Sequence, residues 1–192
     1  MTTNPVSETI NDFAMSAQTK WTSVFIGILA VLLAMCTMGG DNAAKDASRA
    51  NLDATNTWAF FQAKNMRRTA IDLAADEMAI ALAREPALAA PARAMVEAKI
   101  KEYRERSKKL TSEPEKKEGL DELFVRGKDL EALRDAALAR DPYFDWGQAL
   151  LQIAIVLASV SIVASSRPLL YGSVALGGLG TIAMLNGFFM VV

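Results

Sequence analysis

The chain lacks histidine altogether and has one cysteine, Cys36, among its 192 residues. Most zinc and haem sites, Ser–His–Asp triads and the Glu-x-x-His pairs of di-iron bundles all need residues that are missing here. One cysteine cannot form a disulfide within the chain, so the redox compartment is not indicated. We therefore expect no metal site, no cofactor and no catalytic residues, and we predict that the protein is not an enzyme.

The chain also lacks an excess of positive or negative charge, because it has 21 basic and 22 acidic residues and a net charge of −1. Proteins that bind nucleic acid concentrate basic side chains against the phosphates. We expect no nucleic-acid partner, and no pattern of residues suggests a small-molecule substrate. Nearly all the charge lies within residues 41–146; outside them stand Glu8, Asp12, Lys20 and Arg167.

Three long segments, residues 21–38, 147–166 and 169–192, contain no Lys, Arg, Asp or Glu. A helix of about 20 apolar residues spans a bilayer, and a charge at the bilayer centre costs at least about 2.5–3.5 kcal/mol. These segments predict an all-α membrane protein with transmembrane helices over residues 21–40, 147–166 and 169–192. The lipid bilayer is then its first partner, and residues 1–20 are expected to be a polar tail.

Residues 41–146 are rich in helix formers and predict an extramembrane insert built as a helical hairpin or coiled coil. We expect a long helix over about 41–84 and shorter helices over about 91–112 and 115–140. Prolines 86 and 114 mark the breaks, and Ser112-x-x-Glu115 has the form of a capping box. A row of residues spaced by seven predicts the packing seam of the long helix: Leu52, Ala59, Met66, Leu73 and Ile80.

Gly39 and Gly40 stand between the first predicted span and the insert. The helix either stops there and a new one starts at Asp41, or it continues from the span into the insert. We favour the second alternative, because no proline follows until Pro86.

The densest aromatic cluster of the insert supplies the candidate partner or packing residues: Trp58, Phe60, Phe61, Gln62 and Lys64. Aromatic anchors dominate many interfaces, so the cluster could dock a partner. Consecutive aromatic residues also point around a helix, and some of them then pack against the returning helices. We favour this second interpretation.

The segment Trp58-Ala59-Phe60-Phe61-Gln62-Ala63-Lys64 resembles the W-A-[YF]-[YF]-Q-A-K signature of an uncharacterised bacterial membrane-protein family, a domain of unknown function. The order of one span, a charged helical insert and a terminal membrane hairpin is similar over nearly the whole chain. The resemblance implies a multi-pass protein of the bacterial inner (cytoplasmic) membrane with a periplasmic insert, and it implies no activity. This chain has only Arg167 in the hairpin turn, where the family carries several arginines. The positive charges beside the spans do not favour either side by themselves.

Small residues at helical spacing in the last two spans are the candidate transmembrane packing residues: Ala154, Ala158, Ser161, Ser165, Gly177, Gly180, Ala183 and Gly187. Such rows let membrane helices approach closely, within one chain or between chains. We predict a self-associating scaffold or an accessory subunit, partnered by a second copy or by another membrane protein complex. The alternative is a small channel or transporter lined by the terminal hairpin, including Gln148 and Gln152.

Overall fold

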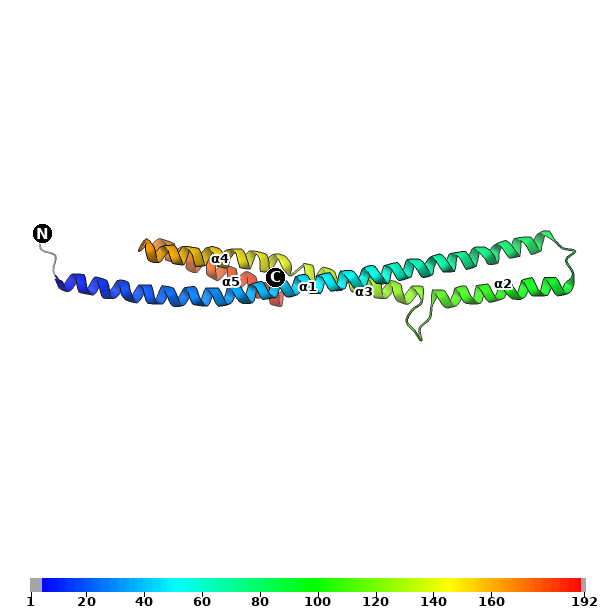
Figure 1. Ribbon diagram of the computed structural model, residues 1–192, viewed down its shortest axis with the longest axis horizontal. Helices are drawn as coiled ribbons and strands as arrows, with labels where there is room; N and C mark the ends of the chain where they lie inside the picture. Colours follow the sequence, from blue (N-terminus) through cyan, green and yellow to red (C-terminus); the bar gives the residue numbers. More distant parts are fainter. Residues whose placement is uncertain (1–4, 191–192) are drawn as a thin grey trace. The chain divides into compact units, whose positions relative to one another are not determined.

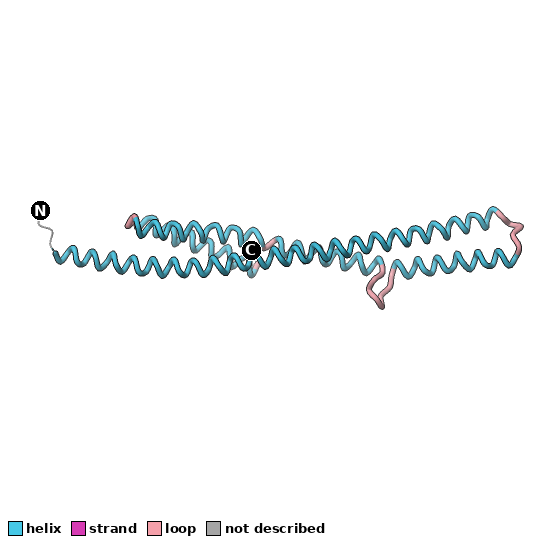
Figure 2. Tube along the Cα trace, viewed as in Figure 1, coloured by secondary structure: helices cyan, strands magenta, loops and turns pink. Residues whose placement is uncertain are grey.

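The computed structural model describes the backbone of residues 5–190 and the side chains of residues 19–190. These residues form five α-helices and no strand, which confirms the predicted all-α fold (Figures 1 and 2). The helices are α1 (Pro5–Arg84), α2 (Ala90–Thr111), α3 (Leu120–Leu138), α4 (Asp141–Val163) and α5 (Arg167–Phe189).

The chain divides into two compact units. The terminal unit consists of Met1–Ala47 and Asp135–Val192, and the insert unit consists of Ser48–Arg134. Helix α1 contributes residues to both units.

Helix α1 includes Gly39 and Gly40, so the favoured alternative of a continuing helix is the one observed. The structure differs from three expected boundaries. Residues expected in a polar tail belong to α1 from Pro5 on, and α3 begins at Leu120 instead of 115. Helix α4 begins at Asp141, before the predicted span, because Pro142 is accommodated in the first helical turn, where its missing N–H group costs nothing.

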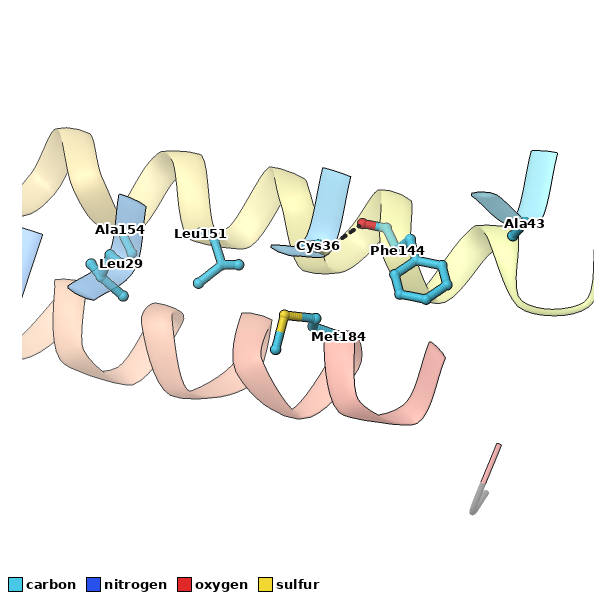
Figure 3. Packing of buried hydrophobic residues seen from close by; sticks show 7 residues of the cluster. All are labelled: Leu29, Cys36, Ala43, Phe144, Leu151, Ala154 and Met184. Carbon is cyan, nitrogen blue, oxygen red and sulfur yellow. Dashed lines mark hydrogen bonds between the residues drawn. The ribbon is translucent and has the colours of Figure 1, made fainter. Parts of the chain in front are cut away.

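The terminal unit packs α4 and α5 as a hairpin against the part of α1 that lies in this unit. Figure 3 shows its core, to which all three helices contribute, with Leu29 and Cys36 from α1, Leu151 from α4 and Met184 from α5. Three helical stretches are long and apolar enough to cross a membrane: Thr19–Arg84, Leu120–Val163 and Arg167–Phe189. Length and composition thus support a multi-pass membrane protein.

The insert unit contains residues 48–84 of α1, the whole of α2 and residues 120–134 of α3. The face of α1 that packs inside this unit carries Ala54 and Ala75, both fully enclosed, with Phe61 half-buried between them. The predicted seam does not pack inside this unit: Leu52, Ala59, Met66, Leu73 and Ile80 are all exposed. The enclosed face is fixed by larger side chains beside it, because Trp58 bonds to α3 and Lys64 bonds to the loop before α3.

Candidate functional site

Trp58 ties α1 to α3 within the insert unit. Its Nε1–H donates a hydrogen bond to Glu131 Oε1 at 2.9 Å. Its ring meets the rings of Phe61 and Phe124 edge-on, with centroid distances of 5.6 Å in both cases. A Cβ atom added to Gly127 would lie 2.8 Å from the Trp58 ring, so the indole packs directly against the backbone of α3 at this glycine. Trp58 is therefore a structural anchor between two helices.

The Glu131 carboxylate is held in its charged form at this anchor. Lys128 Nζ donates a hydrogen bond to Glu131 Oε2 at 2.8 Å, and the indole donates to the other oxygen. These two hydrogen bonds, that from Lys128 first, lower the pKa of the Glu131 carboxyl group. Lys128 Nζ also lies 5.7 Å from the centre of the Trp58 ring, within range of a cation–π interaction.

Lys64 holds the loop that connects α2 with α3. Its Nζ donates a hydrogen bond to the carbonyl oxygen of Glu118 and forms an ion pair with Glu113 Oε2 at 3.8 Å. The side chain of Lys64 is only 10% exposed, so its aliphatic stem is packed as well. Lys64 thus fixes residues 54 positions away along the chain.

The same loop shows that the predicted capping box is wrong. Ser112 follows the end of α2, and its hydroxyl donates to Glu122 Oε1 at 2.7 Å. The backbone N–H of Glu113 donates to the other Glu122 oxygen at 3.2 Å. The hydrogen bond from Ser112 is the largest cause of a lowered pKa for the Glu122 carboxyl group. A carboxylate of α3, and not Glu115, therefore closes the loop.

The predicted aromatic cluster thus separates into two faces of one helix. Trp58, Phe61 and Lys64 take part in packing the insert unit, as the favoured interpretation expects. Phe60 and Gln62 are exposed, although Phe60 also lies 5.6 Å from Lys64 Nζ. The cluster therefore leaves two of its five side chains for contact with a partner.

On the outer face of α1, exposed positions spaced by three and four residues form a stripe without a single charge. We call it the uncharged stripe; it consists of Leu52, Thr55, Asn56, Ala59, Gln62, Ala63, Met66, Thr69, Ala70 and Leu73. Helix α2 of the same unit differs, since nine of its exposed residues are charged. Sequence reasoning identified part of this stripe as the seven-residue seam, and the structure shows that this part is exposed.

Of the predicted transmembrane packing residues, six lie buried inside the terminal unit: Ala154, Ala158, Ser161, Gly177, Gly180 and Gly187. Ala183 is half-buried. Ser165 is misplaced in the prediction, because α4 ends at Val163 and Ser165 is an exposed turn residue with a φ of 47°. A Cβ atom on Gly180 would come within 3.1 Å of the Gly147 carbonyl oxygen, so α4 and α5 touch through their backbones there.

Two buried hydrogen bonds join the helices of the terminal unit. Ser173 Oγ on α5 donates to the carbonyl oxygen of Ala154 on α4 at 2.7 Å. The Cys36 thiol on α1 donates to the carbonyl oxygen of Phe144 at 3.3 Å, the contact drawn in Figure 3. Polar side chains that bond across membrane helices stabilise their packing.

Phe144 is a packing residue that sequence reasoning missed. Its ring meets the Phe188 ring edge-on at 5.0 Å, and Cβ atoms added to Gly39 or Gly187 would clash with it. The signal was present, since Phe144 shares one face of α4 with Leu151 and Ala154.

The family model described as Domain of unknown function (DUF4337) matches residues 18–190. The chain belongs to the DUF4337 family. The comparison with curated proteins gives no match, and neither does the comparison with solved structures. The family description supplies no activity, so function must be argued from the surfaces of this member itself.

In this DUF4337 protein the inside of the terminal unit is filled by side chains such as Leu29 and Leu151, each at most 2% exposed. Gln152 is exposed on the outside of α4, and Gln148 is half-buried. A solute path lined by these glutamines therefore does not run between the helices of one chain, within the described residues. The same residues contain no group of three or more Cys, Asp or Glu that could hold a metal ion.

Proposed function

We propose that this DUF4337 protein is a non-catalytic, self-associating scaffold or an accessory subunit of a membrane assembly. The observation that carries the proposal is the uncharged stripe, which no other described helix of the insert unit covers. An uncharged surface with exposed apolar side chains, such as Leu52, Met66 and Leu73, on an otherwise charged domain is typical of protein interaction sites. The buried aromatic anchors, by contrast, are already used inside the unit.

The proposed location is the bacterial inner membrane, with the insert in the periplasm. Three candidate spans support a multi-pass arrangement, and the resemblance of residues 58–64 to a bacterial signature supports the compartment. A cysteine in the exposed loop at Lys116 should react with an impermeant reagent in intact cells, whereas one placed beside Arg167 should not. The opposite labelling pattern would place the insert in the cytoplasm.

The direct test of the scaffold is the mass of the full chain extracted in mild detergent. We expect a particle that contains either several copies or another membrane protein. A strictly monomeric particle bound to nothing would rule the proposal out. Identifying what co-purifies from native membranes would then separate a self-associating scaffold from an accessory subunit.

A small channel or transporter is the second candidate, and the exposed Gln152 is the observation that favours it. Since the interior of the terminal unit is packed, such a path would have to form between copies, with Gln152 facing it. Solute flux or conductance in vesicles that contain the pure protein would support the channel. Vesicles without flux would leave the scaffold as the better account.

A further inference from the structure

Within the insert unit, helix α1 carries two rows of residues spaced by seven, on opposite faces. One row is used inside the chain: Ala54, Phe61, Arg68, Ala75 and Leu82, all buried or half-buried. The other row runs along the uncharged stripe and stays in solvent, with Leu52, Met66 and Leu73 exposed by 60%, 74% and 59%. Both faces thus have the repeat of a helix packed against a partner helix, and one of them has no partner among the described residues.

The seven-residue spacing indicates what kind of partner fits. An isolated α-helix has 3.6 residues per turn, so a repeat of seven drifts around it by about 20° per heptad. The repeat stays on one line only when the helix supercoils with another helix. The exposed row therefore fits a partner that is itself a helix.

Charge identifies the partner helix. In a parallel, in-register pair of identical helices, each residue at the centre of the contact lies against its own copy, so a charge there would repel itself. The ten residues of the uncharged stripe avoid this cost completely. When two copies lie in one membrane with the same topology, their α1 helices run from the membrane into the insert in the same direction, so the pair is parallel.

We propose that the uncharged stripe is the contact between two copies of this chain, which pair through α1 in parallel and in register. The inference rests on the self-association proposed above and specifies its surface. Beyond Leu73, Asp76 and Glu77 are exposed and would face their own copies, so the contact ends near Leu73 although Ile80 continues the spacing.

Disulfide cross-linking of the full-length protein in membranes tests the contact. Met66→Cys places a thiol on the stripe, and Met95→Cys is the matched control, because Met95 on α2 is 75% exposed and Met66 is 74% exposed. Both variants carry Cys36→Ser, which removes the native thiol and keeps a hydrogen-bond donor toward Phe144. With an oxidant, M66C should give a dimer of the chain and M95C should remain monomeric. Equal cross-linking of the two variants would overturn the proposal.

Register is tested by mixing two differently tagged variants, Leu52→Cys and Leu73→Cys. These positions are 21 residues apart, which is about 31 Å along a helix. An in-register parallel pair joins each variant to itself and yields no mixed product. A mixed disulfide at the level of the self-products would overturn the parallel register.

A charge substitution that needs no oxidant supplies a second measurement. Met66→Glu would place two carboxylates against each other, and we expect the associated fraction in mild detergent to fall at least tenfold relative to Met95→Glu. If the native chain associates but M66C and M66E behave like their Met95 controls, the uncharged stripe is not the contact, although self-association is supported. If the native chain is monomeric and free of partners, both proposals fail. Cross-linking of M66C to a different protein would refute a second copy as the occupant.

Discussion

Trp58 and Phe60 stand two residues apart in α1, but removing their rings should have very different costs. The Trp58 ring packs against Phe61, Phe124 and the backbone at Gly127. Truncating a well-packed aromatic residue to alanine costs about 3–5 kcal/mol, and Trp58 is half-buried, so Trp58→Ala should destabilise the insert unit by about 3 kcal/mol.

Phe60 is 46% exposed and makes none of these ring contacts. Full burial of such a side chain contributes about 1.5–3 kcal/mol, so Phe60→Ala should cost about 1 kcal/mol or less. The expected difference between the two variants is therefore about 2 kcal/mol. Trp58→Phe, which keeps a ring and loses the N–H donor to Glu131, should fall between them.

Native-state amide hydrogen exchange of the full chain in detergent measures this difference, because the amides of α3 report opening of the insert unit alone. The reporting amides are those of residues 120–134, the part of α3 that belongs to the insert unit. We expect the free energy of opening to fall strongly in Trp58→Ala and little in Phe60→Ala. Equal losses, or a larger loss for Phe60→Ala, would refute the assignment of Trp58 to the interior and of Phe60 to the surface.

Three further predictions concern other contacts. Gly147→Ala should destabilise the terminal unit by about 1–3 kcal/mol, because its Cβ would meet Cys36 Sγ and backbone atoms of α5. Gly178→Ala is the control and should be neutral, because the space around Gly178 is open. Unfolding titrated with a denaturing detergent compares the stability of the two variants. The carboxylate of Glu122 has a lowered pKa, so its stabilising effect is present above the ordinary carboxyl range and is lost as the pH falls through the lowered pKa. Glu122→Gln should therefore flatten the acid limb of thermal unfolding measured against pH. Arg68→Met should raise the stability of the insert unit by about 1 kcal/mol, because Arg68 Nε is enclosed without a hydrogen-bond partner among the described residues. Hydrogen exchange measures this change, and a loss of stability would show that the Arg68 guanidinium makes stabilising hydrogen bonds.

Much of the architecture is predictable because it depends on local composition. Charge-free length decides which segments a bilayer accepts, whatever the rest of the chain does, and the three predicted spans correspond to α1, α4 and α5. Prolines fix helix starts in the same local way, as Pro142 and Pro168 do in the first turns of α4 and α5. The small residues of the last spans were also recognisable, because close approach requires them at helical spacing.

Other features depend on partners distant in the sequence. Both faces of α1 in the insert have the same seven-residue period, and the outer face, with Leu52 and Met66, is the more apolar one. Periodicity and hydrophobicity therefore do not decide which of the two faces packs inside the chain. The choice was made by contacts across 54 to 73 residues, those of Lys64 with Glu118 and of Trp58 with Glu131. Those contacts exist only once α3 and its loop lie beside α1, and so only the tertiary structure decided which face of α1 stays free.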